Sequence, residues 1–210
     1  MQQAGFDRIA SVYDGLGRLV FGDAIQHAQE YFLDDDPPQS KVLILGGGTG
    51  NFLVKLLALK PECEIWYVEA SEKMLELSKV KTKNSDRVHF IQGTENSIPS
   101  GIQFDVIITN FYLDMFTDES LDLVLMKIQK ETKPNVLWLA TDFIDKKKWW
   151  QFILLKMMYR FFRTVCDIEA TNLPDWNACL VKKGFLKKKS QFFFSGFIES
   201  TVYCHKSSDR

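Results

Sequence analysis

A glycine-rich segment directly after a short apolar run is the feature that most limits what this chain can fold into. The apolar run is Lys41–Leu45, and glycines follow it at positions 46, 47, 48 and 50. Glycine adopts backbone angles that are closed to other residues, and it lets the main chain approach a ligand that a Cβ would repel. The helix expected over Asn51–Leu59 points unpaired N–H groups and its positive dipole end at the same turn. The segment therefore predicts a strand–turn–helix unit that holds a ligand.

An acidic residue at the end of the next apolar run narrows the choice of ligand. Glu69 lies nineteen residues after Gly50, and a carboxylate at that place can accept hydrogen bonds from both hydroxyls of a ribose. The NAD fingerprint G-x-G-x-x-G would need a glycine at position 51, where this chain has Asn51. The glycine spacing is G-x-G-x-G instead. It predicts a nucleoside-containing cofactor and disfavours NAD, although an NAD-dependent oxidoreductase stays open as an alternative.

The rest of the chain alternates segments typical of buried strands with segments typical of helices, which indicates a parallel sheet. We expect strands over Lys41–Leu45, Glu64–Val68, Val88–Gln92, Phe104–Thr109 and Val136–Thr141, and a terminal hairpin from Gln191–Phe197 and Ser200–His205. We expect helices over Asn51–Leu59, Ser71–Lys79, Glu119–Lys130, Lys147–Thr164 and Trp176–Lys183. The predicted fold class is α/β, with a Rossmann-like, seven-stranded, mostly parallel sheet, a C-terminal antiparallel hairpin and helices on both faces. At 210 residues and 46% hydrophobic, the chain suits one such domain over residues 1–210.

Composition and charge argue against several classes of function. The four cysteines are scattered without a C-x-x-C pair, so we expect neither a metal site nor a disulfide framework. The stretch Met1–Arg18 carries charges and lacks an apolar run, so a cytoplasmic location is the default expectation. Residues 145–210 carry 13 Lys and Arg against 6 Asp and Glu. That basic excess suits an acidic substrate or an anionic surface, but no nucleic-acid module accompanies it, and a solvated surface is favoured over nucleic-acid binding.

Several blocks of sequence, taken in their order and spacing, resemble one family. The blocks are Phe6–Ala10, Tyr13-Asp14, the glycines at 46–50, Glu69–Leu75, Gln92–Pro99 and Phe104–Leu113. Together they cover about residue 6 to residue 143 and resemble the class I S-adenosyl-L-methionine (SAM)-dependent methyltransferases, within them the ubiquinone/menaquinone-biosynthesis-like group. The resemblance implies methyl transfer from SAM to a small, hydrophobic acceptor. A non-catalytic SAM-binding or regulatory protein is a second alternative to this function.

The resemblance also implies which residues contact SAM. These positions are Tyr13, Gly46, Gly47, Gly48, Gly50, Glu69, Ala70, Met74, Thr94, Glu95 and Asn110. The glycines would pass the methionine part of SAM and Glu69 would hold the ribose. Ala70 and Met74 would pack near the adenine, and Asn110 would lie beside the methionine part.

One position departs from the family pattern. The loop beside the adenine usually carries an acidic residue directly after its glycine, where this chain has Thr94, followed by Glu95. Three outcomes stay open: the Thr94 hydroxyl substitutes, Glu95 takes over the contact, or the contact is lost.

The acceptor side is less defined by sequence. SAM carries an activated methyl group, so the protein has to align the acceptor and exclude water, and a general base is needed only if the acceptor loses a proton. No catalytic residue is identified. The candidates for substrate binding are Tyr112, Asp114 and Asp142, the last at the carboxyl edge of the sheet where open α/β folds place ligands.

Two segments are expected to close over the site. Residues 1–38 would form an N-terminal lid that includes Tyr13, and residues 146–176 a substrate-side insertion. Within the insertion, residues 146–163 are basic, aromatic and apolar, and they are too interrupted by charge to span a bilayer. Two interpretations stay open for this stretch: a helix or pocket lid packed on the domain, which is favoured, or contact with a membrane surface as a peripheral protein.

Overall fold

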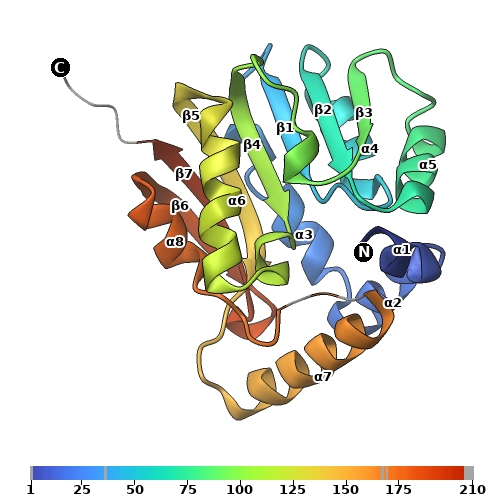
Figure 1. The fold of residues 1–210 in the computed structure, drawn as a ribbon, viewed down its shortest axis with the longest axis vertical. Coiled ribbons are helices and arrows are strands. Elements are labelled where there is room, and N and C mark those ends of the chain that lie inside the picture. Colours follow the sequence, from blue (N-terminus) through green and yellow to red (C-terminus); the bar gives the residue numbers. More distant parts are fainter. Residues whose placement is uncertain (1, 36, 167, 169, 206–210) are drawn as a thin grey trace.

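A seven-stranded sheet organises the computed structural model, which describes residues 2–35, 37–166, 168 and 170–205 (Figure 1). The strand order is β3-β2-β1-β4-β5-β7-β6. The strands are β1 (Lys41–Leu45), β2 (Glu64–Glu69), β3 (Val88–Gln92), β4 (Phe104–Asn110), β5 (Thr132–Phe143), β6 (Phe185–Phe193) and β7 (Ile198–His205). Neighbours among β1 to β5 pair in parallel, and β7 pairs antiparallel with both β5 and β6. The predicted fold class is therefore confirmed.

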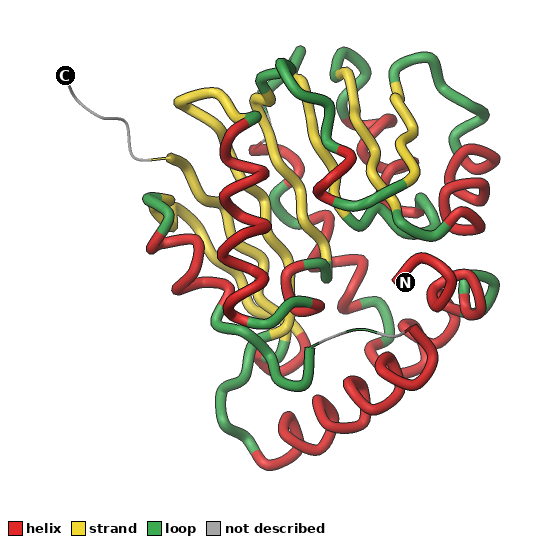
Figure 2. The backbone as a smooth tube through the Cα atoms, viewed as in Figure 1, coloured by secondary structure: helices red, strands yellow, loops and turns green. Residues whose placement is uncertain are grey.

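Helices cover both faces of this sheet (Figure 2). They are α1 (Gln2–Ile9), α2 (Tyr13–Phe21), α3 (Ala24–Glu30), α4 (Asn51–Leu59), α5 (Glu72–Lys81), α6 (Asp118–Lys130), α7 (Trp149–Cys166) and α8 (Trp176–Lys182). Short 3₁₀ turns are η1 (Leu33–Asp35), η2 (Glu95–Ser97), η3 (Leu113–Met115) and η4 (Phe194–Gly196). Among the described residues, none of the helices is long and apolar enough to cross a membrane.

The two main cores follow from the alternation of side chains along a strand. In β1, Leu43 and Leu45 pack into the core beneath α6 and α8, while Val42 and Ile44 pack into the core beneath α4 and α5. All four side chains are essentially inaccessible to water. A central parallel strand that is buried on both faces is accordingly a continuous apolar run, which is why the sequence signal for β1 is strong.

A third core closes the carboxyl edge of the sheet with helices from distant parts of the chain. Helices α1, α2 and α7 contribute Ile9, Phe21 and Tyr159 to this cluster. The end of β5 adds Phe143, and Phe197 comes from the turn before β7. In Figure 1, α1, α2 and α7 lie together below the ends of the parallel strands. The loops that follow β1, β2 and β4 therefore face a region that α1, α2 and α7 cover.

The predicted bounds of the terminal hairpin are wrong for its first strand. We expected a strand over residues 191–197, but β6 covers Phe185–Phe193, and Phe194 and Ser195 form the turn with φ of 46° and 54°. The lysines at 187–189 lie exposed on this edge strand. Charged side chains are common on edge strands because they discourage pairing with other chains, and they remove the hydrophobic alternation that would identify the strand. The strand β5 likewise begins earlier than expected, at Thr132.

Replacement of Phe197 by alanine tests the third core. Phe197 is completely buried, and its ring lies 5.0 Å from that of Phe143 and 5.7 Å from that of Trp150. We expect Phe197→Ala to lower the free energy of unfolding by about 3–5 kcal/mol, because the cavity removes these contacts. Leu186→Ala, on the exposed face of β6, should cost less than about 1 kcal/mol. Urea unfolding monitored by circular dichroism measures both, and equal losses would contradict this account of the core.

Candidate functional site

The glycine-rich loop turns directly from β1 into α4 and leaves open space beside it. Gly46, Gly48 and Gly50 have φ of 65°, 70° and 87°, a region that favours glycine. A Cβ on Gly47 would lie only 2.1 Å from Cζ of Tyr67, whereas a Cβ on Gly48 would meet no atom within 4 Å. The Tyr67 hydroxyl donates a hydrogen bond of 3.0 Å to the carbonyl oxygen of Gly48. The Tyr67 side chain thus packs against the loop at Gly47, while the space beside Gly48 is open. A loop that binds a ligand needs such an open side.

Glu69 joins this loop to the following helix. Its Oε2 accepts a 2.7 Å hydrogen bond from the Gly48 N–H, and its Oε1 accepts one of 2.7 Å from the Ser71 N–H. Burial raises the pKa of Glu69 from its usual range, and the backbone N–H donors oppose that shift. An ionised carboxylate offers about four acceptor positions, so these two hydrogen bonds leave acceptor capacity on Glu69. Its contact with a ribose stays a prediction.

The residues expected beside an adenine ring lie directly after Glu69. Ala70 is partly buried, and Met74 is 2% exposed in the first turn of α5. The Ser71 hydroxyl caps this helix by accepting a hydrogen bond of 3.2 Å from the Met74 N–H. The cap fixes the first turn of α5 against the end of β2, and an adenine contact through Ala70 and Met74 stays a prediction.

Thr94 and Glu95 have different partners in the structure. Thr94 caps the 3₁₀ turn η2, where its hydroxyl accepts from the Asn96 N–H at 3.4 Å. Glu95 lies deeper: its Oε2 accepts a 3.0 Å hydrogen bond from the Tyr112 hydroxyl, and its Oε1 lies 3.7 Å from Nζ of Lys127. Burial, followed by the charge of Glu95, raises the pKa of Tyr112. Glu95 is thus the acidic side chain held between the loops after β3 and β4, although its contact with a cofactor is untested.

Asp142 lies inside the protein and organises the turn after β4. It is completely buried, and its Oδ2 accepts hydrogen bonds from the N–H groups of Tyr112, Leu113 and Asp114 at 3.2, 2.9 and 3.2 Å. Burial and then the nearby charge of Asp114 raise the pKa of Asp142, and the backbone donors oppose this. The Asp142 side chain therefore holds the backbone of the turn after β4 in place from the protein interior. Asn110, the last residue of β4, is partly buried and lies beside Thr141 of β5.

Tyr112 and Asp114 lie on the side of the turn that faces the glycine-rich loop and α7. The Tyr112 ring is so close to Gly46 that a Cβ there would be 2.7 Å from its Cδ2. The Asp114 carbonyl oxygen accepts a 3.0 Å hydrogen bond from the Tyr159 hydroxyl, and burial raises the pKa of Asp114 to about 7. The pKa of Tyr13 is raised by burial and then by the charges of Asp114 and Glu69. The structure thus brings Tyr13, Glu69, Tyr112 and Asp114 into one region.

An acidic side chain of α2 holds the N-terminal helices to the glycine-rich loop. Asp14 accepts hydrogen bonds from the Thr49 hydroxyl at 2.7 Å and from the Asn51 amide at 2.8 Å. Nζ of Lys81 lies 3.3 Å from the same carboxylate. The ring of the adjacent Tyr13 packs against the third core, and its contact with a cofactor stays a prediction.

A second carboxylate does the same for α1. Asp7 accepts from the Ser71 hydroxyl and, at 3.1 Å, from the Lys73 N–H at the start of α5. Sequence reasoning did not assign a contact to Asp7 or Asp14, although both stand in the N-terminal blocks that resemble the family. Their spacing of seven residues gave no sign of which donors they would meet, because those donors lie in loops far along the chain.

Two shallow recesses lie on α7. The first has a volume of about 540 Å³ and is lined by Lys156, Tyr159, Arg160, Arg163, Thr164 and Thr171. The second has a volume of about 600 Å³ and is lined by Asp145, Lys147, Lys148, Trp149, Phe152 and Ile153. Both lie outside the region of Glu69 and Asp114, but Tyr159 reaches from the first recess to the Asp114 carbonyl.

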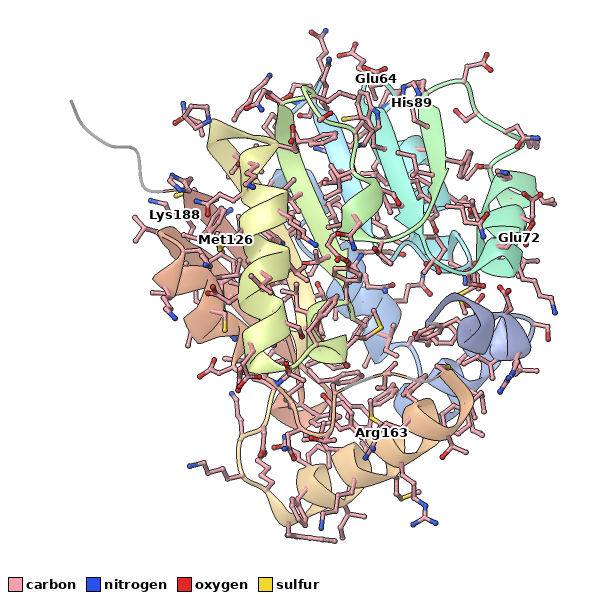
Figure 3. The ribbon with its side chains drawn as sticks, in the orientation of Figure 1. Glu64, Glu72, His89, Met126, Arg163 and Lys188 are labelled. Atoms are coloured by element: carbon pink, nitrogen blue, oxygen red, sulfur yellow. The ribbon has the colours of Figure 1, made fainter. Side chains whose placement is uncertain are left out.

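One histidine–carboxylate pair lies at the opposite edge of the sheet. His89 and Glu64 pair at 2.7 Å near the amino ends of β3 and β2, at the top of Figure 3, whereas Arg163 on α7 is at the bottom. Within the described part of the chain, no three His, Cys, Asp or Glu side chains gather in a way that could hold a metal ion. The chemistry available at the site is therefore that of carboxylates, tyrosine hydroxyls and backbone N–H groups.

The fold and this geometry define an α/β protein that binds a nucleoside-containing cofactor at the carboxyl edge of its sheet. Comparison with known proteins gives the family. Residues 42–135 match the family model described as "Methyltransferase domain". The chain is 35% identical over 118 residues to the demethylmenaquinone methyltransferase of Thermotoga maritima, a match that covers 54% of this chain and 49% of the relative. It is 32% identical over 130 residues to the malonyl-[acyl-carrier protein] O-methyltransferase of Priestia megaterium, covering 61% and 46%.

Solved structures share the fold. The putative methyltransferase of Haloferax volcanii, solved in complex with the Trm112 methyltransferase activator, matches with a TM-score of 0.77 at 14% identity and covers 100% of both chains. The chain spans about half the length of the curated relatives that it matches. It resembles the class I SAM-dependent methyltransferases, and its relatives include a demethylmenaquinone methyltransferase and a ubiquinone/menaquinone biosynthesis C-methyltransferase.

A single added methyl group tests the docking of the N-terminal helices. A Cβ on Gly5 would lie 2.2 Å from Cα of Cys166, whereas a Cβ on Gly15 would meet nothing within 4 Å. We expect Gly5→Ala to push α1 away from α7 and to speed proteolytic cleavage within residues 1–35 at least fivefold. Gly15→Ala should not, because alanine favours a helix over glycine. Limited proteolysis with mass spectrometry measures both, and equal cleavage rates would refute close packing of α1 on α7.

Proposed function

We propose that this chain transfers a methyl group from SAM to a small, hydrophobic acceptor. The observation that supports this most directly is the carboxylate of Glu69, which accepts hydrogen bonds from both the glycine-rich loop and the start of α5. SAM supplies a methyl group activated by a positively charged sulfur. The protein has then to hold the nucleoside, align the acceptor and exclude water.

The proposed cofactor contacts follow the geometry of the loops. Gly46 to Gly50 would accommodate the methionine part, beside Asn110 and under Tyr13. Glu69 would bind the ribose, and Ala70 with Met74 would pack on the adenine. For the contact with the adenine amino group we favour Glu95 over Thr94, because its carboxylate is partly buried beside Tyr112 while the Thr94 hydroxyl already caps η2.

We assign the acceptor to the region between the turn after β4 and the helices that roof it. The third core supplies an apolar wall there, with Phe6, Phe111 and Phe162 packed against its buried members. Residues 1–38 would serve as a lid and residues 146–176 as the substrate-side insertion within one domain of residues 1–210. The two curated relatives named above differ in acceptor, since one name gives demethylmenaquinone and the other malonyl-[acyl-carrier protein]. Their names therefore support the reaction class and leave the acceptor of this chain open.

Calorimetric titration with SAM, S-adenosylhomocysteine and NADH tests the cofactor. We expect micromolar binding of the two sulfur compounds, no binding of NADH, and at least tenfold weaker binding to Glu69→Gln, because an amide loses a charge-assisted hydrogen bond to the ribose. Glu72→Gln is the matched control, since Glu72 is exposed at the start of α5 (Figure 3).

The outcomes separate this proposal from its alternatives. If neither sulfur compound binds the unaltered protein, the methyltransferase proposal fails, and NADH binding would favour an oxidoreductase. Binding of both sulfur compounds without methyl transfer to any phenol, quinol, amine or carboxylate acceptor would favour a non-catalytic SAM-binding protein.

We further propose that α7 rests on an anionic membrane surface. One stripe of the helix is buried, through Gln151, Leu155 and Tyr159. The opposite stripe of an ordinary surface helix is polar. Here it also carries large exposed apolar side chains: Trp149 is 77% exposed and Met157 64%. A large exposed apolar stripe of this kind is typical of helices that lie in a lipid interface.

Basic side chains flank this apolar stripe. Lys147, Lys148, Lys156 and Arg160 line the two recesses on α7 together with Arg163. The charges complement acidic lipid headgroups, and each basic residue near such a surface contributes about 1 kcal/mol to binding. Such a position would place α7, which covers the site, against the lipid bilayer in which a hydrophobic acceptor dissolves.

Vesicle co-sedimentation tests the membrane proposal. We expect binding to vesicles of phosphatidylcholine with phosphatidylglycerol and little binding to phosphatidylcholine alone. The pair Trp149→Ser with Met157→Ser should weaken binding at least tenfold, whereas Leu123→Ser with Met126→Ser, which removes exposed apolar side chains from α6, should not. Absence of binding to both vesicles, or equal effects of the two pairs, would refute this role and favour α7 as a lid alone.

A further inference from the structure

Both backbone polar groups of Asp114 form hydrogen bonds, and these bonds fix the position from which its side chain projects. Its N–H donates to the buried carboxylate of Asp142 on β5, and its carbonyl oxygen accepts from the Tyr159 hydroxyl on α7. The first bond is 3.2 Å long and the second 3.0 Å. Two elements that are distant in the sequence therefore position one residue of a three-residue turn.

The carboxyl group so positioned has an oxygen without a partner. Asp114 Oδ1 is buried, and within the described residues no group donates a hydrogen bond to it. No described Lys or Arg forms an ion pair with Asp114, and the ionisable groups around it are Asp142 on β5, Tyr13 on α2 and Tyr159 on α7. A buried acceptor without a donor destabilises the folded protein. Such a destabilising group is expected where a ligand supplies the missing donor.

The position of Asp114 relative to the cradle indicates which ligand that is. Tyr112, two residues before it, packs on Gly46, and Tyr13 is close enough to both Asp114 and Glu69 for their charges to raise its pKa. Asp114 and Glu69, the residue proposed to bind the ribose, therefore both lie near Tyr13. An acceptor held beside Asp114 would accordingly be close to the proposed cofactor site.

We propose that Oδ1 of Asp114 is the catalytic base that accepts the proton of a hydroxyl or amine acceptor. The inference rests on the proposed function. The acceptor oxygen or nitrogen forms a bond to the methyl carbon, the carbon–sulfur bond breaks with its electron pair remaining on sulfur, and the proton from the acceptor passes to Oδ1. The step needs no further reactant. It restricts the acceptor to molecules with an O–H or N–H group on an apolar body that fits beside the third core.

The ionisation of Asp114 suits this task. Burial raises the pKa of its carboxyl group to about 7, so the group accepts a proton readily and releases it again near neutral pH. The charged form increases as the pH rises through 7. An interaction that needs the carboxylate should therefore strengthen between pH 6 and pH 8.

Sinefungin tests the assignment without an identified acceptor. It is a SAM analogue with a protonated amine at the position of the transferred methyl group, whereas S-adenosylhomocysteine has no group there. We expect calorimetry at pH 8 to show at least tenfold tighter binding of sinefungin than of S-adenosylhomocysteine, because its amine meets Oδ1. The preference should shrink at pH 6. Asp114→Asn should abolish it while affinity for S-adenosylhomocysteine changes less than twofold.

Controls make each result decisive. Asp86→Asn, at an exposed site, should keep the full preference. If Asp114→Asn does not fold, Tyr159→Phe removes the hydroxyl that holds the Asp114 carbonyl and should reduce the preference at least threefold. An unchanged preference in the folded variant would overturn the role of Asp114 and leave the proposed function standing. Failure of the unaltered protein to bind either compound would instead overturn the proposed function.

Discussion

Buried carboxylates that accept hydrogen bonds from the backbone of a neighbouring loop are the interaction on which the carboxyl edge of this sheet depends. Glu69 ends β2 and holds the loop after β1, which is its neighbour in the sheet. Asp142 in β5 holds the turn after β4, which is again the adjacent strand. In each case the strand pairing sets the carboxylate opposite the loop, because the last paired residues, Leu45 with Val68 and Asn110 with Thr141, stand just before them. The register of the sheet thus determines the shape of the site.

This arrangement explains how much of the molecule could be predicted from its sequence. The strand–turn–helix unit at Gly46 and the acidic end of β2 are local patterns, so their place in the fold followed from spacing alone. The strand β6 was misplaced because its exposed lysines carry no hydrophobic alternation. The burial of Asp142 was also invisible, since a carboxylate after an apolar run is equally compatible with solvent. Its role depends on three N–H groups that only the turn after β4 brings together.

The roof of the site combines two different surfaces on one helix. The buried stripe of α7 completes the third core and presents the Tyr159 hydroxyl to the turn after β4. The opposite stripe exposes Trp149 and Met157 among basic residues. A membrane surface that displaced α7 would therefore also move the Asp114 backbone, through the hydrogen bond from the Tyr159 hydroxyl. This links the proposed membrane contact to the proposed acceptor side in physical terms, because both act on the same rigid element.

The close contact between Gly5 and Cys166 has a consequence for the order in which the chain acquires its structure. Helix α1 is synthesised before α7, but the surface that receives it is complete only when the end of α7 has emerged. Until then Phe6 lacks its contact with the Phe162 ring, 6.3 Å away. The contact spans most of the sequence, and contacts of such long range form late because loop closure has to precede them. Helix α1 accordingly docks late although it is made early, and nascent chains stalled before residue 166 should engage chaperones through this helix.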